Sequence, residues 1–188
     1  TISAGTVTLA TAVIVTNALT ISGGTFAKST FAITSAGSLT MSGGDLTSTS
    51  GAVVVTGAMN ISSAASAIDF GSEAWTVSGT WTNVSTDAVG WEAGTGTVTF
   101  DSATGGTMTF AGANLGEAEF SGVTFNSTGG TAQTFPMATR ALRFSGTLSI
   151  TDTTSTTTLA TTDLGLTTGA LSVGNGGILT ANVTTAAF

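Results

Sequence analysis

The chain has 188 residues, of which 41% are hydrophobic and only 7% are charged, and its formal net charge is −7. The negative charge argues against nucleic acid as a partner, because phosphates require a basic surface. No apolar run approaches the ~20 residues that a membrane-spanning helix needs. The absence of cysteine and histidine excludes disulfides, thiolate metal sites and every catalytic triad that uses a histidine base.

Residues 1–15 alternate apolar residues with small polar ones, a pattern that predicts short strands of a first coil. The segment contains neither an amphipathic helix nor a charged strand that would cap this coil. Because an uncovered strand leaves its backbone groups unpaired, we expect an open sheet edge here. The chain starts at Thr1 rather than Met, which predicts a processed or trimmed N-terminus.

Residues 17–66 repeat one phrase three times at intervals of twenty residues. The apolar residues of the first copy, Leu19 and Ile21, lie two positions apart and therefore face the same side of a strand. A fixed period near twenty is typical of a solenoid, in which each repeat is one coil stacked on the last. The three copies occupy residues 17–24, 37–44 and 57–63.

Other positions of the repeat agree with this stacking. Each copy starts with Asn17, Gly37 or Gly57, residue types that tolerate positive φ and so predict a sharp corner. Two more apolar columns recur at the same interval: Phe26 with Leu46, and Val13 with Ile33 and Val53. We predict an all-β, right-handed parallel β-helix of about nine coils with ~20–25 residues per coil. The alternative is an antiparallel β-sandwich of the strand-exchange pilin type, which the twenty-residue period disfavours.

The middle of the chain departs from this period. It holds all three tryptophans, Trp75, Trp81 and Trp91, and predicts either a wider coil or a loop that leaves the rod. Further on, the repeat lengthens to about 25 residues and phenylalanine replaces leucine and isoleucine as the filler of the coil. We therefore expect one solenoid domain over residues 1–188, made of regular coils at 1–66, a Trp-containing insert at 67–95, wider Phe-rich coils at 96–135 and terminal coils at 136–188.

The wider coils resemble a known group of proteins. Residues 96–110 and their echo at 123–135 look like the repeats of bacterial and archaeal extracellular β-solenoid proteins. That group includes surface adhesins, autotransporter-like passengers and large repetitive cell-surface proteins. The resemblance covers most of the chain and implies a parallel β-helix at the cell surface. It carries over no functional residue, because the repeats of that group are scaffold.

Acidic residues are the main candidates for catalysis, since two carboxylates are enough for a glycosidase. A β-helix enzyme similar to pectate lyase would also need a basic residue at its site. We interpret the acids as solvated surface groups and Arg140 as a surface ion-pair partner. We therefore predict no catalytic residue and no enzymatic activity. The residues considered are the pairs Glu117 with Glu119, Glu73 with Glu92, and Arg140 with Arg143.

A calcium site requires several converging oxygen ligands. Four acids of the irregular segment are candidates, but none has the Asp-x-Asp-x-Asp-Gly spacing, and we predict no metal site and no cofactor. The tryptophans suit a sugar-stacking platform, although we interpret them as a plug of the widened core. The four acids are Asp69, Glu73, Asp87 and Glu92.

Four Asn-x-Ser/Thr sequons are candidate glycosylation sites. Asn60 lies between two inward-facing positions, so its side chain is expected to point outward, where it can accept a glycan. The four are Asn60, Asn83, Asn126 and Asn182.

We expect a structural subunit of an extracellular filament or surface layer. Copies would join head-to-tail through open solenoid ends, or by donating a strand from residues 6–15. The expected partner is the chain itself, as a homo-oligomer or fibre, with carbohydrate or a cell surface in addition. The alternatives are a scaffold or binding segment of a large adhesin and, third, a carbohydrate-active β-helix enzyme.

Overall fold

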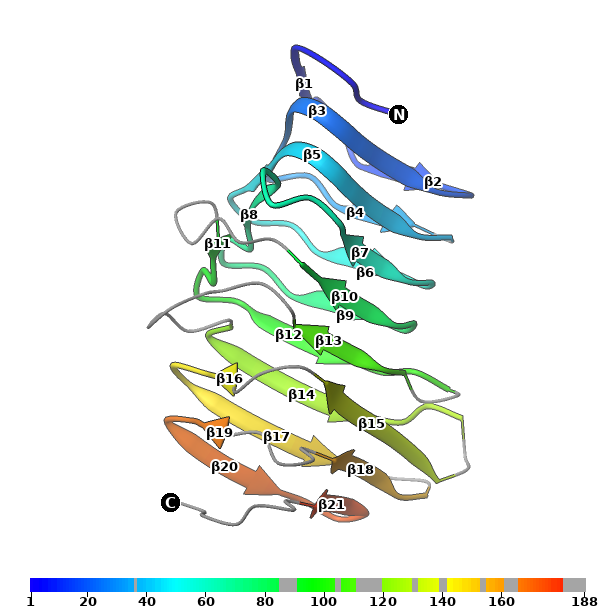
Figure 1. Cartoon of the computed structure of the whole chain (residues 1–188), viewed down its shortest axis with the longest axis vertical. Coiled ribbons are helices and arrows are strands. Elements are labelled where there is room, and N and C mark those ends of the chain that lie inside the picture. The colour runs from blue at the N-terminus through cyan, green and yellow to red at the C-terminus, as the bar shows by residue number, and fades with distance from the viewer. Residues whose placement is uncertain are drawn as a thin grey trace.

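The computed structural model describes residues 1–35, 37–84, 91–103, 106–110, 120–129, 132–138, 142–152, 155–160 and 166–180. These residues contain strands and turns but no helix. Successive coils stack along one axis, with β1 (Thr6–Thr8) and β21 (Gly177–Thr180) at opposite ends of the stack (Figure 1). All pairings between the named strands are parallel, as in the pair of β2 (Val13–Val15) with β4 (Ile33–Ser35) and the pair of β12 (Thr97–Phe100) with β14 (Gly122–Asn126). The chain is therefore a β-solenoid, and the antiparallel sandwich is wrong.

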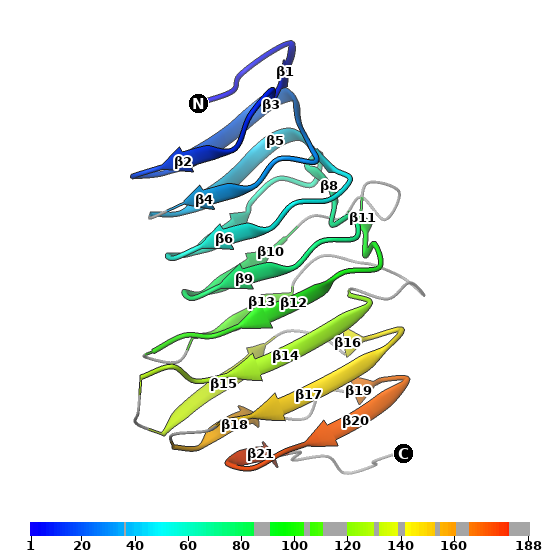
Figure 2. The same ribbon diagram turned by 180° about the vertical axis from the view of Figure 1, so that it is seen from behind.

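One side of the solenoid is a single parallel sheet of eight strands (Figure 2). Each strand pairs with the strand one coil earlier and the strand one coil later, and no register shift interrupts the sheet. We call it the eight-stranded sheet. Its strands in spatial order are β2 (Val13–Val15), β4 (Ile33–Ser35), β6 (Val53–Val55), β9 (Trp75–Val77), β12 (Thr97–Phe100), β14 (Gly122–Asn126), β17 (Thr147–Thr151) and β20 (Ala170–Val173).

The opposite side is an eleven-stranded sheet that bends around a corner of the coil. Its two longest strands continue through glycines at positive φ, Gly24 and Gly44, where the register between them shifts. Its strands are β1 (Thr6–Thr8), β3 (Leu19–Ser29), β5 (Leu39–Ser48), β7 (Met59–Ile61), β8 (Ala67–Asp69), β10 (Trp81–Asn83), β11 (Trp91–Glu92), β13 (Met108–Phe110), β15 (Gln133–Ala138), β18 (Thr157–Ala160) and β21 (Gly177–Thr180). A third sheet pairs β16 (Leu142–Arg143) with β19 (Leu166–Thr167).

The predicted side-chain columns are confirmed. Leu19 pairs with Leu39, which pairs with Met59, and all three side chains are buried. Phe26 likewise pairs with Leu46. The residue between two inward positions faces outward, because side chains alternate along a strand. Apolar columns thus fill the interior, while threonine and serine cover much of the outside.

Coil length changes along the molecule as the sequence predicts. The step from Val13 to Ile33 is twenty residues, whereas the step from Val98 to Val123 is twenty-five. Each coil contributes one strand to the eight-stranded sheet, so the described part has at most eight coils, fewer than the nine expected. The number is lower because the longer coils contain more residues each. In Figure 2, the strands of the eight-stranded sheet face the viewer and run from right to left while the chain descends from the N-terminal coil, which is the path of a right-handed coil.

The prediction that glycine starts each repeat because the corner needs a positive φ is wrong. Gly37 and Gly57 are not among the residues with positive φ. Instead, a Cβ on Gly57 would lie 2.1 Å from the carbonyl oxygen of Gly37, and a Cβ on Gly37 would lie 2.0 Å from that of Asn17. Glycine is required here because the backbones of adjacent coils touch.

The Trp-containing segment follows the wider-coil alternative in the residues that the structure describes. Trp75 lies in register with Val53, and Trp81 lies in register with Met59, each one coil of twenty-two residues later. Both sheets therefore continue through this region, and its strands belong to the rod.

Candidate functional site

The three tryptophans form part of the core. Trp75, Trp81 and Trp91 expose 1%, 0% and 4% of their surface. Trp81 packs edge-to-face on Trp91 and Phe120, with ring centroids 6.1 and 5.5 Å away, and Trp75 donates a hydrogen bond to the carbonyl oxygen of Phe70 at 3.1 Å. The plug interpretation is confirmed. A sugar-stacking platform on these rings is wrong, because no ring face is open to a ligand.

Glu73 is not a solvated surface acid, contrary to the sequence-based expectation. It lies inside the coil, where its Oε1 is 3.2 Å from Lys28 Nζ, and both side chains are almost completely buried. Ser48 Oγ donates a hydrogen bond to the same Oε1, and Lys28 Nζ donates one to the carbonyl oxygen of Ser50. This buried ion pair links three successive coils. Its enclosure leaves Glu73 without access to a polysaccharide.

Sequence reasoning assigned no role to Lys28. A signal was present, because Phe26, Ala27 and Lys28 alternate along β3, and the inward position of Phe26 implies an inward Lys28. Ser48 holds the corresponding inward position of β5, two residues after Leu46. A buried lysine requires a partner, since an isolated charge in the core is very costly.

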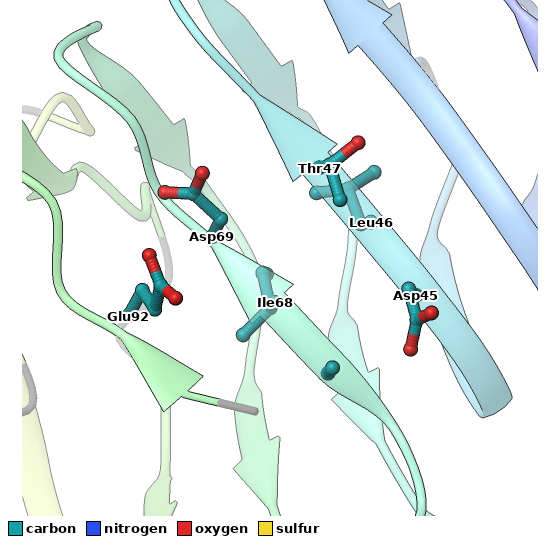
Figure 3. Close-up of a pocket in the computed structure, with 7 residues that line it drawn as sticks. Asp45, Leu46, Thr47, Ile68, Asp69 and Glu92 are labelled. Carbon is teal, nitrogen blue, oxygen red and sulfur yellow. The ribbon is translucent and has the colours of Figure 1, made fainter. Parts of the chain in front are cut away.

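Two other acids meet on the outer surface, at a shallow pocket of about 230 Å³ (Figure 3). Asp69 in β8 and Glu92 in β11 lie in register on neighbouring coils. Asp69 Oδ1 accepts a hydrogen bond from the backbone N–H of Gly71 at 2.8 Å. Asp45 lies farther along the pocket and accepts a hydrogen bond from Thr25 at 3.4 Å. The pocket is lined by Asp45, Leu46, Thr47, Ala67, Ile68, Asp69 and Glu92.

The structure therefore separates the acids that were considered together. Glu73 is enclosed in the core, whereas Glu92 is exposed, so these two do not form a catalytic pair. In the part of the chain that the structure describes, no group of three or more histidine, cysteine or acidic side chains is placed to hold a metal ion. Arg143 is exposed in β16. Glu117, Glu119, Arg140 and Asp87 lie outside the described residues.

The sequons differ in accessibility. Asn60 lies half-buried between two buried neighbours of β7, so its side chain faces outward as predicted. Asn126 occupies an equivalent outward position in β14. Asn83 exposes 0% of its surface and lies inside the coil. Asn182 lies outside the described residues.

The first and last coils expose large apolar side chains that belong to the core columns. Leu171 and Val173 pair with Leu148 and Ile150, which are completely buried, yet they expose 41% and 46% of their own surface. They belong to core columns, but within the described residues β20 pairs with a neighbouring coil on one side only. At the other end, Val7 pairs with the buried Phe26 and exposes 41%.

The same two end coils carry two further exposed apolar side chains, which face outward. Ile14 in β2 is 81% exposed, and Ile178 in β21 is 43% exposed. Together with Val7, Leu171 and Val173, they are the large exposed hydrophobic residues of the described chain. All five lie in the first or last coil, so each end of the solenoid combines apolar side chains with a strand edge that no other described strand pairs with.

The end coils are also free of charged side chains. All ten acids lie between Asp45 and Asp163, and the three cations lie between Lys28 and Arg143. The net charge of −7 is therefore carried by the middle of the molecule. Contact between two such ends would bring no like-charged side chains together, and the edge strands carry none of the charges that usually discourage pairing.

No protein-family model matches this chain, and neither the curated proteins nor the solved structures contain a match. Within the described residues, no helix has the length and apolar character required to cross a membrane. The exposed apolar side chains make the two ends of the described solenoid its candidate functional surfaces, where apolar contact and backbone pairing are available.

Proposed function

We propose that the chain is a structural subunit of an extracellular filament or surface layer, and that its copies join head-to-tail through the ends of the solenoid. One observation carries this proposal: core-column side chains such as Leu171 and Val173 are almost half exposed at an end where, among the described strands, the second edge of β20 is unpaired. Apolar side chains and unpaired strand edges favour association with another strand.

The two ends of the molecule are different surfaces, so contact between them is heterologous. A heterologous contact that does not close into a ring generates an open filament. The uncharged end coils support this mode, because they let two ends approach without electrostatic repulsion. The extracellular location rests on the resemblance of the repeats at residues 96–110 and 123–135 to those of cell-surface solenoids.

We propose no enzymatic role. The buried position of Glu73 supports this view, since its carboxylate is already engaged by Lys28 and Ser48. The remaining acid pair, Asp69 and Glu92, lies in an open pocket lined by no basic residue. An assay of the purified chain on a panel of polysaccharides, with Glu92→Gln as the comparison, tests this part of the proposal.

A scaffold segment of a large adhesin is the second candidate, favoured by the same exposed columns. Further coils of one long chain would cover Leu171 and Val173 as well as a second copy does. The reading frame that encodes the chain separates the two, because a frame far longer than 188 residues favours the adhesin segment.

Sedimentation velocity and negative-stain micrographs of the purified chain test self-assembly. We expect rods of variable length that grow with protein concentration. The variant Val173→Asp places a charge in the end contact and is expected to shift the rods to monomers. Its matched control, Thr99→Asp, places the charge on the outer face of the middle coil and leaves the rods intact. Monodisperse monomers of the unmodified chain at high concentration would rule the proposal out.

A further inference from the structure

The eight-stranded sheet is the one sheet whose columns run without a break from the first coil to the last among the described residues. Register pairs join Val13 in β2, through every intervening strand, to Leu171 in β20. The same pairs join Ile14 to Ser172 on the outer face of the sheet. The strands β2 and β20, which end this sheet in the described structure, therefore present equivalent positions of one repeating pattern at their outer edges (Figure 2).

In the eleven-stranded sheet, the first and last strands do not lie in the same column. At the first coil, β1 lies over Thr25–Ala27, the second half of β3. At the last coil, β21 follows β18, which pairs with residues 133–136 of β15. The first half of β3 instead leads to Met137 of β15, by way of β5, β7, β10 and β13. The end strands of this sheet thus belong to different columns.

Strand donation is the other route by which copies of this chain would join. It would require residues 6–15 to leave their own subunit, but both strands in this segment are already paired. β1 pairs with β3 over three residues, and β2 pairs with β4 over three residues. Ile2 adds a bridge to Ile21. Donation would break these parallel pairs, whereas end stacking keeps all of them and adds new ones.

We infer that β20 of one copy pairs in parallel with β2 of the next copy, with Leu171 over Val13 and Val173 over Val15. This inference rests on the proposed filament function and specifies its contact. The partner surface is a second copy of the same chain. Pairing in this register covers the exposed core columns of β20 with the matching columns of β2, and it continues the sheet across the junction.

The pairing of β20 with β2 in this register brings two outer-face residues of different copies together. Ser172 of one copy must lie directly beside Ile14 of the next, at the ~4.8 Å spacing of neighbouring strands. That spacing lies within the Cα separation that a disulfide bridges, roughly 4.4–6.8 Å. Both residues are exposed and point away from the core, so cysteine at these positions leaves the interior unchanged. The chain has no cysteine of its own to interfere.

The test is oxidation of the double variant Ile14→Cys with Ser172→Cys, followed by a non-reducing gel. We expect a ladder of covalent oligomers that collapses to one band on reduction. Each single variant is expected to stop at a minor dimer band, because one cysteine per copy cannot extend a chain. The matched control is Thr76→Cys with Ser172→Cys, which places the first cysteine in the middle of the sheet and is expected to give no ladder.

The outcomes separate this contact from the proposed function. A ladder in the double variant alone supports the pairing of β20 with β2. Filaments in micrographs of the same sample without a ladder would overturn this register while leaving the filament function in place. A ladder of equal yield in the Thr76 control would also overturn it. Absence of both filaments and ladder would reject the contact and the function together.

Discussion

Replacing Glu73 by leucine removes one partner of the buried ion pair while leaving the other in the core. In the unmodified chain, Lys28 Nζ has Glu73 Oε1 at 3.2 Å and the carbonyl oxygen of Ser50 as polar partners. The variant leaves this ammonium group with the carbonyl alone, in a position with no exposure to solvent. Ser48 Oγ also loses the carboxylate to which it donates.

The expected loss is about 3–5 kcal/mol in the free energy of unfolding, the typical cost of breaking a buried pair by removing one partner. Replacing both members should behave differently, because two apolar side chains of similar volume remove the charges together. Glu73 Oε2 has no hydrogen-bond partner among the described residues, so the native pair is incompletely satisfied. We therefore expect Lys28→Met with Glu73→Leu to lie within about 1 kcal/mol of the unmodified chain, or above it.

Urea unfolding followed by tryptophan fluorescence measures these differences, since Trp75, Trp81 and Trp91 all pass from the core to solvent. The matched control is Glu92→Leu, an exposed acid whose replacement should change stability by less than about 0.5 kcal/mol. Equal stability of Glu73→Leu and the unmodified chain would refute the buried pair. So would a double variant as unstable as the single one.

Three further substitutions test the core, the coil contacts and the sequons. Trp81→Ala should lower the free energy of unfolding by about 3–5 kcal/mol in urea, because it empties a fully buried position. Thr82→Ala, on the outer face of the same strand, should lower it by less than about 0.5 kcal/mol. Equal losses would contradict the assignment of Trp81 to the inner face and Thr82 to the outer face. Gly57→Ala should lower the free energy of unfolding by about 1–3 kcal/mol, because the added Cβ would clash with the backbone of Gly37. Gly122→Ala should be tolerated, because the nearest atom to its added Cβ belongs to a threonine side chain, 3.3 Å away. In a host that glycosylates sequons, the folded protein should carry no glycan at Asn83, which is completely buried, and glycopeptide mapping that finds one there would contradict the fold of β10.

The period of twenty residues was sufficient to predict the fold, because stacked coils repeat their inward positions at the coil length. Leu19, Leu39 and Met59 lie in register for this reason. Counting residues between repeats predicts the strand pairs less reliably where the coil lengthens. Residues added at a corner change the spacing without changing which strand residues face inward. Trp75 therefore pairs with Val53, twenty-two residues earlier, and not with Met59, sixteen residues earlier.

The buried ion pair could not be predicted from the repeat. Alternation in β3 places Lys28 inward, but a lysine in a chain with so few charges is expected at the surface. Its partner, Glu73, follows two coils later in a turn outside the strands, where no periodic pattern applies. Pairings of this kind depend on the path of the corners, and they become visible only when the coils are placed in space.

Electron diffraction, or the power spectrum of cryo-micrographs of aligned filaments, tests the central claim most directly. If copies stack end to end with their strands in register, a strong repeat of ~4.8 Å must run along the filament axis, because the strands lie across it. A ~4.8 Å repeat perpendicular to the filament axis, or particles that never exceed the length of one copy, would contradict head-to-tail stacking of solenoids.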